Sequence, residues 1–263
     1  MQRDPGEQTQ DSAQAGEQLH GDAGGVSSVW WRTRRVTPRQ TAPLSRERIV
    51  GEAVALLDQE GTGRLTMRRL AERLEAGATT LYWHVDTKDD VLDLALDAVF
   101  GEVALPEPAS GEHWRAVLSG FLHHWRAVLL EHPWSAPLLG TRPLLGPNAL
   151  ARSEFLHSTL LTAGIPEVHL TSAAYGLSNY VIGSATTRAA WHANGNESAT
   201  RRAAGKHLQT HRANYPVQAQ YLAMTDQNWE ASFTRGLDYL LDGLEAHTRE
   251  PALSDADRHA SGS

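Results

Sequence analysis

The residues best suited to contact another molecule gather at and just after positions 79–85, which read TTLYWHV. Hydroxyl, indole, imidazole and ammonium groups follow one another there, on Thr79, Thr80, Tyr82, Trp83, His84 and Lys88. Short hydroxyl side chains can pair with base edges, and the larger donors suit phosphate oxygens. A core aromatic patch is the alternative interpretation, but one short helix would then have to bury a Tyr, a Trp and a His. The pattern therefore favours a surface that contacts DNA.

Two short helices joined by a turn are needed to position this stretch. Their inward positions are apolar: Leu65, Leu70, Ala71, Leu74 and Leu81. Thr66 is the expected cap of the first helix, and the second is expected near 78–84. In a helix-turn-helix the second helix lies in the major groove. Ala78 then lets the backbone approach base edges, Thr66 can bond a phosphate at its helix N-terminus, and Arg68 can reach a guanine.

The run LTMRRLAERLEAGATTLYWHV (65–85), followed by TKDDVLDL (87–94), resembles the DNA-binding domain of TetR-family transcriptional repressors. The pattern is closest to the tetracycline-repressor subgroup, which carries Thr-Leu-Tyr-Trp-His-Val at this place. The resemblance implies a homodimer whose two reading heads bind a near-palindromic double-stranded DNA operator. It places base contacts on Arg68, Ala78, Thr79 and Thr80. It places phosphate contacts on Thr66, Tyr82, Trp83, His84 and Lys88.

The turn between the two helices departs from the family pattern. Where the family usually has Gly-Val, this chain has Glu75-Ala76, and Gly77 follows. A tight turn needs a positive φ at that point, which costs a side-chain-bearing residue about 1 kcal/mol. We therefore expect either a strained Glu75 or a turn of different shape.

An arginine-rich arm precedes this region. The segment VWWRTRRVTPRQ (29–40) places four arginines ahead of the first acid at Glu47, namely Arg32, Arg34, Arg35 and Arg39. Residues 28–88 carry eleven Lys+Arg against seven acids, so positive charge concentrates here although the whole chain has a net charge of −7. Such an arm can read a narrow minor groove, and a solvated basic linker is the alternative. Adjacent Trp30 and Trp31 are expected to dock on the protein or near DNA.

The rest of the chain predicts an all-α protein. It has 263 residues, 41% of them hydrophobic, no Cys, no secretory signal pattern and no apolar run long enough to cross a membrane, so we expect a cytoplasmic protein. Helical stretches are expected near 110–130, 134–140, 147–163, 166–193, 198–222 and 227–247. The predicted organisation is a flexible arm (1–44), a three-helix helix-turn-helix DNA-binding domain (45–90), a larger helical ligand-binding and dimerisation domain (91–249) and a disordered tail (250–263).

Aromatic residues of the larger domain indicate a small-molecule chamber. Phe121 and Trp125 are four residues apart and share a helix face, and Arg142 stands in an apolar Gly- and Pro-rich run. An apolar pocket with a few convergent polar groups is the usual ligand site. The candidate ligand-binding residues are Phe121, Trp125, Leu138, Arg142, Phe155, Tyr175 and Asn179. Core packing is the default for most of these aromatics.

The resemblance also limits the ligand. Gly140-Thr141-Arg142-Pro143 matches a run that moves on drug binding in the tetracycline-repressor subgroup. However, the subgroup's metal-coordinating His falls on Leu138, and its second ligand His falls near Ala104. We therefore expect no magnesium–tetracycline complex, no metal and no other cofactor. We expect instead a polycyclic aromatic, antibiotic-like effector that releases the repressor from an export gene.

The last apolar stripe on the chain lies at Phe233, Leu237, Leu240, Leu241 and Leu244. By itself it predicts core packing, whereas the resemblance implies that this helix and the helix from Pro166 form a four-helix dimer interface. The thirteen histidines show no metal-protease spacing, and no catalytic motif stands out, so we expect no enzyme. Two alternatives remain open: a DNA-binding regulator with a filled core, and an all-α enzyme or binding module with a fortuitous helix-turn-helix.

Overall fold

The computed structural model describes residues 29–30, 44–106, 113–193, 195–221 and 228–248. These residues form helices and no strand, which confirms the all-α prediction. The helices are α1 (Arg46–Glu60), α2 (Met67–Arg73), α3 (Ala78–Tyr82), α4 (Lys88–Glu102), α5 (Trp114–Glu131), α6 (Ser135–Leu139), α7 (Pro147–Thr162), α8 (Glu167–Ala193), α9 (Glu197–Thr210), α10 (Pro216–Tyr221) and α11 (Trp229–Thr248). None of them is both long and apolar enough to cross a membrane.

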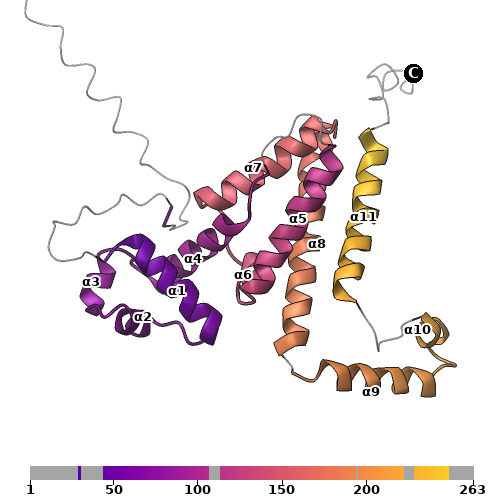
Figure 1. Cartoon of the computed structure of the whole chain (residues 1–263), viewed down its shortest axis with the longest axis horizontal. Helices are drawn as coiled ribbons and strands as arrows, with labels where there is room; N and C mark the ends of the chain where they lie inside the picture. The colour runs from indigo at the N-terminus through magenta and orange to yellow at the C-terminus, as the bar shows by residue number, and fades with distance from the viewer. Residues whose placement is uncertain (1–28, 31–43, 107–112, 194, 222–227, 249–263) are drawn as a thin grey trace, which may run out of the picture.

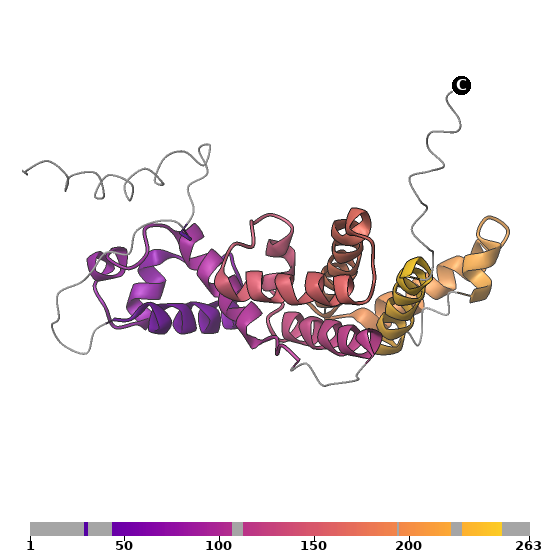
Figure 2. The same ribbon diagram turned by 90° about the horizontal axis from the view of Figure 1, so that it is seen from above.

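The helices follow one another along an elongated molecule (Figures 1 and 2). Helices α1–α3 form one end, α4–α8 and α11 the middle, and α9 with α10 the other end. Helix α8 packs against α5, α6, α7 and α11, so it is the central helix of the larger domain.

The three-helix head is held by capped ends and a small apolar core. Ser45 accepts a hydrogen bond from the Arg48 backbone N–H (3.1 Å), and Thr66 accepts one from that of Arg69 (3.1 Å). Each cap satisfies an amide that the first turn of a helix leaves unpaired. The inward positions expected from the sequence are all at most 3% exposed, which confirms that assignment: Leu65, Leu70, Ala71, Leu74 and Leu81.

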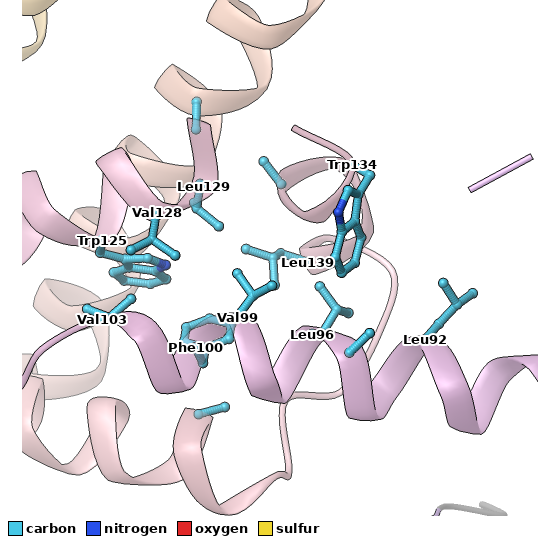
Figure 3. Packing of buried hydrophobic residues seen from close by; sticks show 14 of the residues in the cluster. Leu92, Leu96, Val99, Phe100, Val103, Trp125, Val128, Leu129, Trp134 and Leu139 are labelled. Atoms are coloured by element: carbon cyan, nitrogen blue, oxygen red, sulfur yellow. The ribbon is translucent and has the colours of Figure 1, made fainter. Parts of the chain in front are cut away.

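Helix α4 connects the head to the larger domain. It starts with the expected capping box, in which Thr87 and Asp90 each bond the other's backbone N–H. Buried side chains then occur around the whole helix, because α4 packs on α1, α5 and α7. Figure 3 shows Leu96, Val99 and Phe100 pointing from α4 toward apolar side chains of the larger domain.

Charged side chains join α4 and α7 by capping each other's ends. Asp97 of α4 accepts hydrogen bonds from the Ala149 backbone N–H (2.9 Å) and the Asn148 amide (3.1 Å) in the first turn of α7. Arg152 of α7 returns its guanidinium to the last turn of α4, donating to the carbonyls of Val103 (2.9 Å) and Gly101 (2.8 Å). Both contacts oppose the sign of the helix dipole they meet.

The close approach of these two helices depends on a glycine. A Cβ atom on Gly146, the cap of α7, would lie 2.1 Å from Oδ1 of Asp97. Any side chain there would therefore displace the buried carboxylate.

One predicted helix is wrong. The stretch expected as a single helix at 198–222 is two helices, α9 and α10, separated by a turn at 211–215. Pro216 begins α10, because proline lacks an N–H and fits the first position of a helix rather than its interior.

The stripe on α11 follows its default prediction within one chain. Phe233, Leu237 and Leu241 are at most 2% exposed, where α11 packs on α8 and α5. Leu240, in contrast, is 36% exposed and lies off this buried line. The intramolecular core therefore uses only part of the apolar surface of α11.

Candidate DNA-binding and ligand-binding sites

Helix α3 buries one side chain and exposes the rest. Leu81 is fully buried, whereas Ala78, Thr79 and Thr80 are exposed. Tyr82 and Trp83 are 45% and 55% exposed, so the core-patch interpretation of the aromatic pair is wrong. The structure brings the short polar residues and the aromatics together on one outward surface, as the DNA-contact prediction requires.

Four further residues predicted to contact DNA lie around α3 in different settings. The Arg68 side chain is 89% exposed and pairs only with Glu72 one turn along α2 (2.9 Å). The Thr66 hydroxyl accepts from the helix, which leaves its proton to donate to a phosphate. Lys88 donates to the Thr62 carbonyl (3.1 Å), so one of its three N–H groups fastens α4 to the loop before α2. His84, the residue after Trp83 in the sequence, is half-buried.

The turn before α3 has the strained geometry that we expected from Glu75-Ala76 standing where the family usually has Gly-Val. Glu75 has φ of 52°, the positive value that the turn requires, and the other positive φ angles in the described chain belong to glycines. The Ala76 N–H donates to the Ala71 carbonyl (3.0 Å) and the Glu75 N–H to the Glu72 carbonyl (3.1 Å). These two bonds form a Schellman motif, in which the residue at the position of Glu75 is usually glycine.

The arginines of the arm lie outside the described residues: Arg32, Arg34, Arg35 and Arg39. The residues just before them are described. Val29 is buried and Trp30 is half-buried against the core, in a small niche with Leu96 of α4 and Leu144 of the loop before α7. The prediction that the Trp pair docks on the protein is therefore confirmed for Trp30, and Trp31 lies outside the described part.

The larger domain contains a cavity of about 250 Å³ between α4, α5, α7 and α8. Its lining is mostly apolar, with one arginine, one histidine and three hydroxyl groups from serine and threonine. The lining residues are Phe100, Trp125, Leu144, Ala149, Arg152, Ser153, Leu156, His157, Thr171, Ala174, Tyr175, Ser178 and Ile182.

Two of the seven predicted ligand residues line this cavity, Trp125 and Tyr175. Phe121 and Phe155 lie behind the cavity lining. Their ring centroids are 5.0 Å apart, and the ring centroids of Phe121 and Trp125 are 6.2 Å apart. Leu138 packs against the core, and the exposed Asn179 gives way to its neighbour Ser178, which the helical turn carries to the cavity. None of these four residues lines the cavity itself. They remain candidate ligand-binding residues only because they support or adjoin other residues.

Arg142, a predicted ligand-binding residue, is not among the residues that line the cavity, and its charge is paired elsewhere. Its guanidinium pairs with Asp89 and with Asp93 (2.7 Å), both on the first turns of α4. Burial opposes the charge, but hydrogen bonds to the two carboxylates outweigh it and hold the pKa of Arg142 above its ordinary value. Arg142 therefore ties the loop after α6 to α4. The carboxylates lie about fifty positions away in the sequence, so no local pattern revealed them.

Sequence reasoning missed Arg152 and His157, the charged and titratable residues of the cavity. The available signal was their spacing on α7. Ala149, Arg152 and Leu156 are spaced by three and then four residues, so a polar group shares a helix face with apolar ones.

A polar cluster joins the head to the larger domain at the far side of α4. His132 contacts Asp58 of α1 through Nδ1 (2.8 Å) and Glu102 of α4 through Nε2 (3.0 Å). The Trp134 indole N–H also donates to Asp58 (2.6 Å). Because both imidazole nitrogens face carboxylates, the arrangement is satisfied by the doubly protonated ring. Burial disfavours that charge, but the bonds to Asp58 and Glu102 raise the pKa of His132 above 6.5.

The sites so far define a class: a helix-turn-helix DNA-binding protein whose head is fixed to a cavity-bearing helical domain. Comparison with known proteins identifies the family within this class. The family model "Bacterial regulatory proteins, tetR family" matches residues 49–95, and "Tetracyclin repressor-like, C-terminal domain" matches residues 107–248. The chain belongs to the TetR family of transcriptional regulators, which confirms the resemblance.

Relatives of this chain are transcriptional regulators. An HTH-type transcriptional regulator of Saccharopolyspora erythraea is 48% identical over 224 residues, 85% of this chain and 93% of that protein. The repressor DrrR1 of Streptomyces coeruleorubidus is 30% identical, over 86% of each chain. The crystal structure of Streptomyces coelicolor ActR in complex with actinorhodin has a TM-score of 0.72 and 31% identity, covering 80% of this chain and all of that one.

The strained turn gives a first prediction. Glu75→Gly removes the cost of a Cβ at positive φ, and the greater chain entropy of unfolded glycine offsets part of the gain. We expect a net stabilisation of about 0.5–1 kcal/mol, measured by thermal or urea unfolding. Glu75→Ala is the control, because it removes the carboxylate but keeps the Cβ, and it should give no such gain. Equal stabilisation by both variants would assign the effect to charge instead.

The junction cluster gives a pH-dependent prediction. A group with a raised folded-state pKa contributes stability that is fully present below its ordinary pKa and is lost as pH rises through the folded-state pKa. The difference in melting temperature between the wild type and His132→Gln should therefore be largest at mildly acidic pH and shrink toward alkaline pH. His207→Gln, on the exposed face of α9, serves as the control. A His132→Gln difference that does not change with pH contradicts the assignment.

Proposed function

We propose that this protein is a homodimeric, ligand-responsive repressor that binds a near-palindromic operator. Its effector is a small, polycyclic aromatic, antibiotic-like molecule, and its target is an export gene for that molecule. One observation carries the proposal: the cavity reaches Phe100 on α4, and the same helix begins at Lys88 beside the DNA-contact surface. Occupancy of the cavity can thus alter the position of the head.

The DNA contacts follow from exposure on and near α3. Arg68, Ala78, Thr79 and Thr80 would face base edges. Phosphates would be contacted by Thr66, Tyr82, Trp83, His84 and Lys88, and by the arm arginines Arg32, Arg34, Arg35 and Arg39. The two reading heads would come from a dimer through α8 and α11, whose large exposed apolar side chains include Val168, Tyr175 and Tyr239.

The cavity supports a ligand-responsive regulator over one with a filled core. A space of about 250 Å³ lined by residues between 100 and 182 is where an effector would be expected. The complex of ActR with actinorhodin supports an aromatic effector by analogy. Leu138 packs in the apolar core, and the Ala104 N–H donates to His124 Nδ1 (3.1 Å), so we retain the prediction that magnesium–tetracycline is not the ligand.

The function is tested by selecting bound fragments from genomic DNA with the purified full-length protein. We expect a motif with two related half-sites beside a transporter gene, and loss of selection for Thr80→Ala or Trp83→Ala. Thr80→Ala should relax sequence preference, whereas Trp83→Ala should weaken binding to all fragments alike. A control substitution on the far end of the molecule, Arg212→Met, should change neither. Recovery of no enriched motif at low salt would overturn the proposal.

The arm gives a separate prediction. Removing residues 1–40 should weaken operator binding and flatten its salt dependence, by about 0.9 in log–log slope for each phosphate that the protein no longer binds. Replacing the four arm arginines by Gln should reproduce the effect with Trp30 still present. Removing residues 1–28 alone is the control and should leave affinity and slope unchanged. If the four-Gln variant binds like the wild type, the arm is only a linker.

A further inference from the structure

Arg152 is a cation that faces the cavity without a carboxylate partner. Among the residues that the structure describes, no Asp or Glu lies within ion-pair distance of it, in contrast to Arg142 with its two aspartates. Its guanidinium donates only to oxygens of neutral groups: the carbonyls of Gly101 and Val103, and weakly (3.4 Å) to Asn148. Burial lowers the pKa of Arg152, with Asp97 opposing the effect at longer range.

The other polar groups of the cavity complete a site rich in donors. Ser153, Thr171 and Ser178 contribute hydroxyl groups to the lining, and His157 contributes an imidazole. Among the described residues, no Asp or Glu lines the cavity, whereas Arg152, His157 and three hydroxyl groups do. The electrostatic environment therefore favours an acceptor-rich or anionic molecule.

The remaining lining suits a flat apolar body. Phe100 and Trp125 pack with ring centroids 5.5 Å apart, and Tyr175 lies on α8 at another part of the lining. Leu144, Leu156 and Ile182 add aliphatic side chains to the lining. Aromatic surfaces with a charged group at one edge match an aromatic acid.

Arg152 also has a mechanical connection to α4. The two carbonyls that it holds, Gly101 and Val103, belong to the last turn and C-cap of α4, where the helix dipole is negative. An anion in the cavity would compete with these carbonyls for the same guanidinium. A charged acceptor forms the stronger hydrogen bond, so the competition favours the ligand.

We propose that the effector is an aromatic carboxylate whose anionic group binds Arg152, and that this contact draws the guanidinium from the C-terminal carbonyls of α4. This inference rests on the proposed function and adds the charge of the effector and the residue that reads it. Arg152 is thus the specificity-determining residue of the cavity and its link to the helix that carries the reading head.

The test uses two probes that share one anthraquinone scaffold. Rhein carries a carboxylate, and aloe-emodin carries a hydroxymethyl group in its place. By calorimetry on the wild type, rhein should bind about tenfold or more tightly than aloe-emodin, because it gains a charge-assisted bond. Arg152→Met should abolish this preference, and Arg152→Lys should keep part of it because the positive charge remains. Arg212→Met, an exposed arginine away from the cavity, is the matched control and should retain the full preference.

The link to α4 is read from DNA binding. Rhein should release the wild type and Arg212→Met from a captured operator fragment, and Arg152→Met should lose this response. Melting temperatures of all variants exclude unfolding as the cause, and the comparison of the two probes on the wild type needs no variant at all. Equal or tighter binding of aloe-emodin overturns the inference, as does binding of neither probe. Binding of rhein through Arg152 without release of DNA overturns the link to α4. Operator selection by the protein is measured without either probe, so failure of the proposed function is seen separately.

Discussion

The rest of the structure depends on the reciprocal capping between α4 and α7. Asp97 satisfies the first turn of α7, and Arg152 satisfies the last turn of α4. Each charge meets a helix end of opposite partial charge, and Gly146 permits the approach. Helix α4 is also packed on α1, so this helix pair joins the three-helix head to the helices that line the cavity.

The contact between α4 and α1 differs from the contact between α4 and α7. It depends on a titratable imidazole, whereas Asp97 and Arg152 supply two fixed charges. Asp58, His132 and Glu102 bring together α1, the end of α5 and the end of α4. Apolar packing holds α4 along its length. The hydrogen bonds of this cluster also fix the relative orientation of three helices, because they form only when the helices stand in particular positions. The head is thus attached by apolar packing along α4 and by polar contacts, among them the His132 cluster, which depends on the protonation of the imidazole.

Sequence reasoning succeeded where the cause was local. The caps at Thr66 and Thr87, the inward leucines and the positive φ of Glu75 all follow from residues within one or two turns. It failed where the cause was a partner far along the chain. Arg142 was predicted to bind the ligand because the aspartates that pair with it lie on α4, and Arg152 was missed because the carbonyls it holds also belong to α4. Helical phase explains the smaller error, in which Ser178 rather than Asn179 reaches the cavity.

The docking of Trp30 fixes the residue that stands just ahead of the arm arginines in the sequence. Trp30 packs beside α4 and the loop before α7, and Leu44 is buried at the start of the head. The four arm arginines therefore lie in the sequence between two residues that pack against the described core. A shift of the loop before α7 would move Trp30, which stands two residues ahead of the first of these arginines.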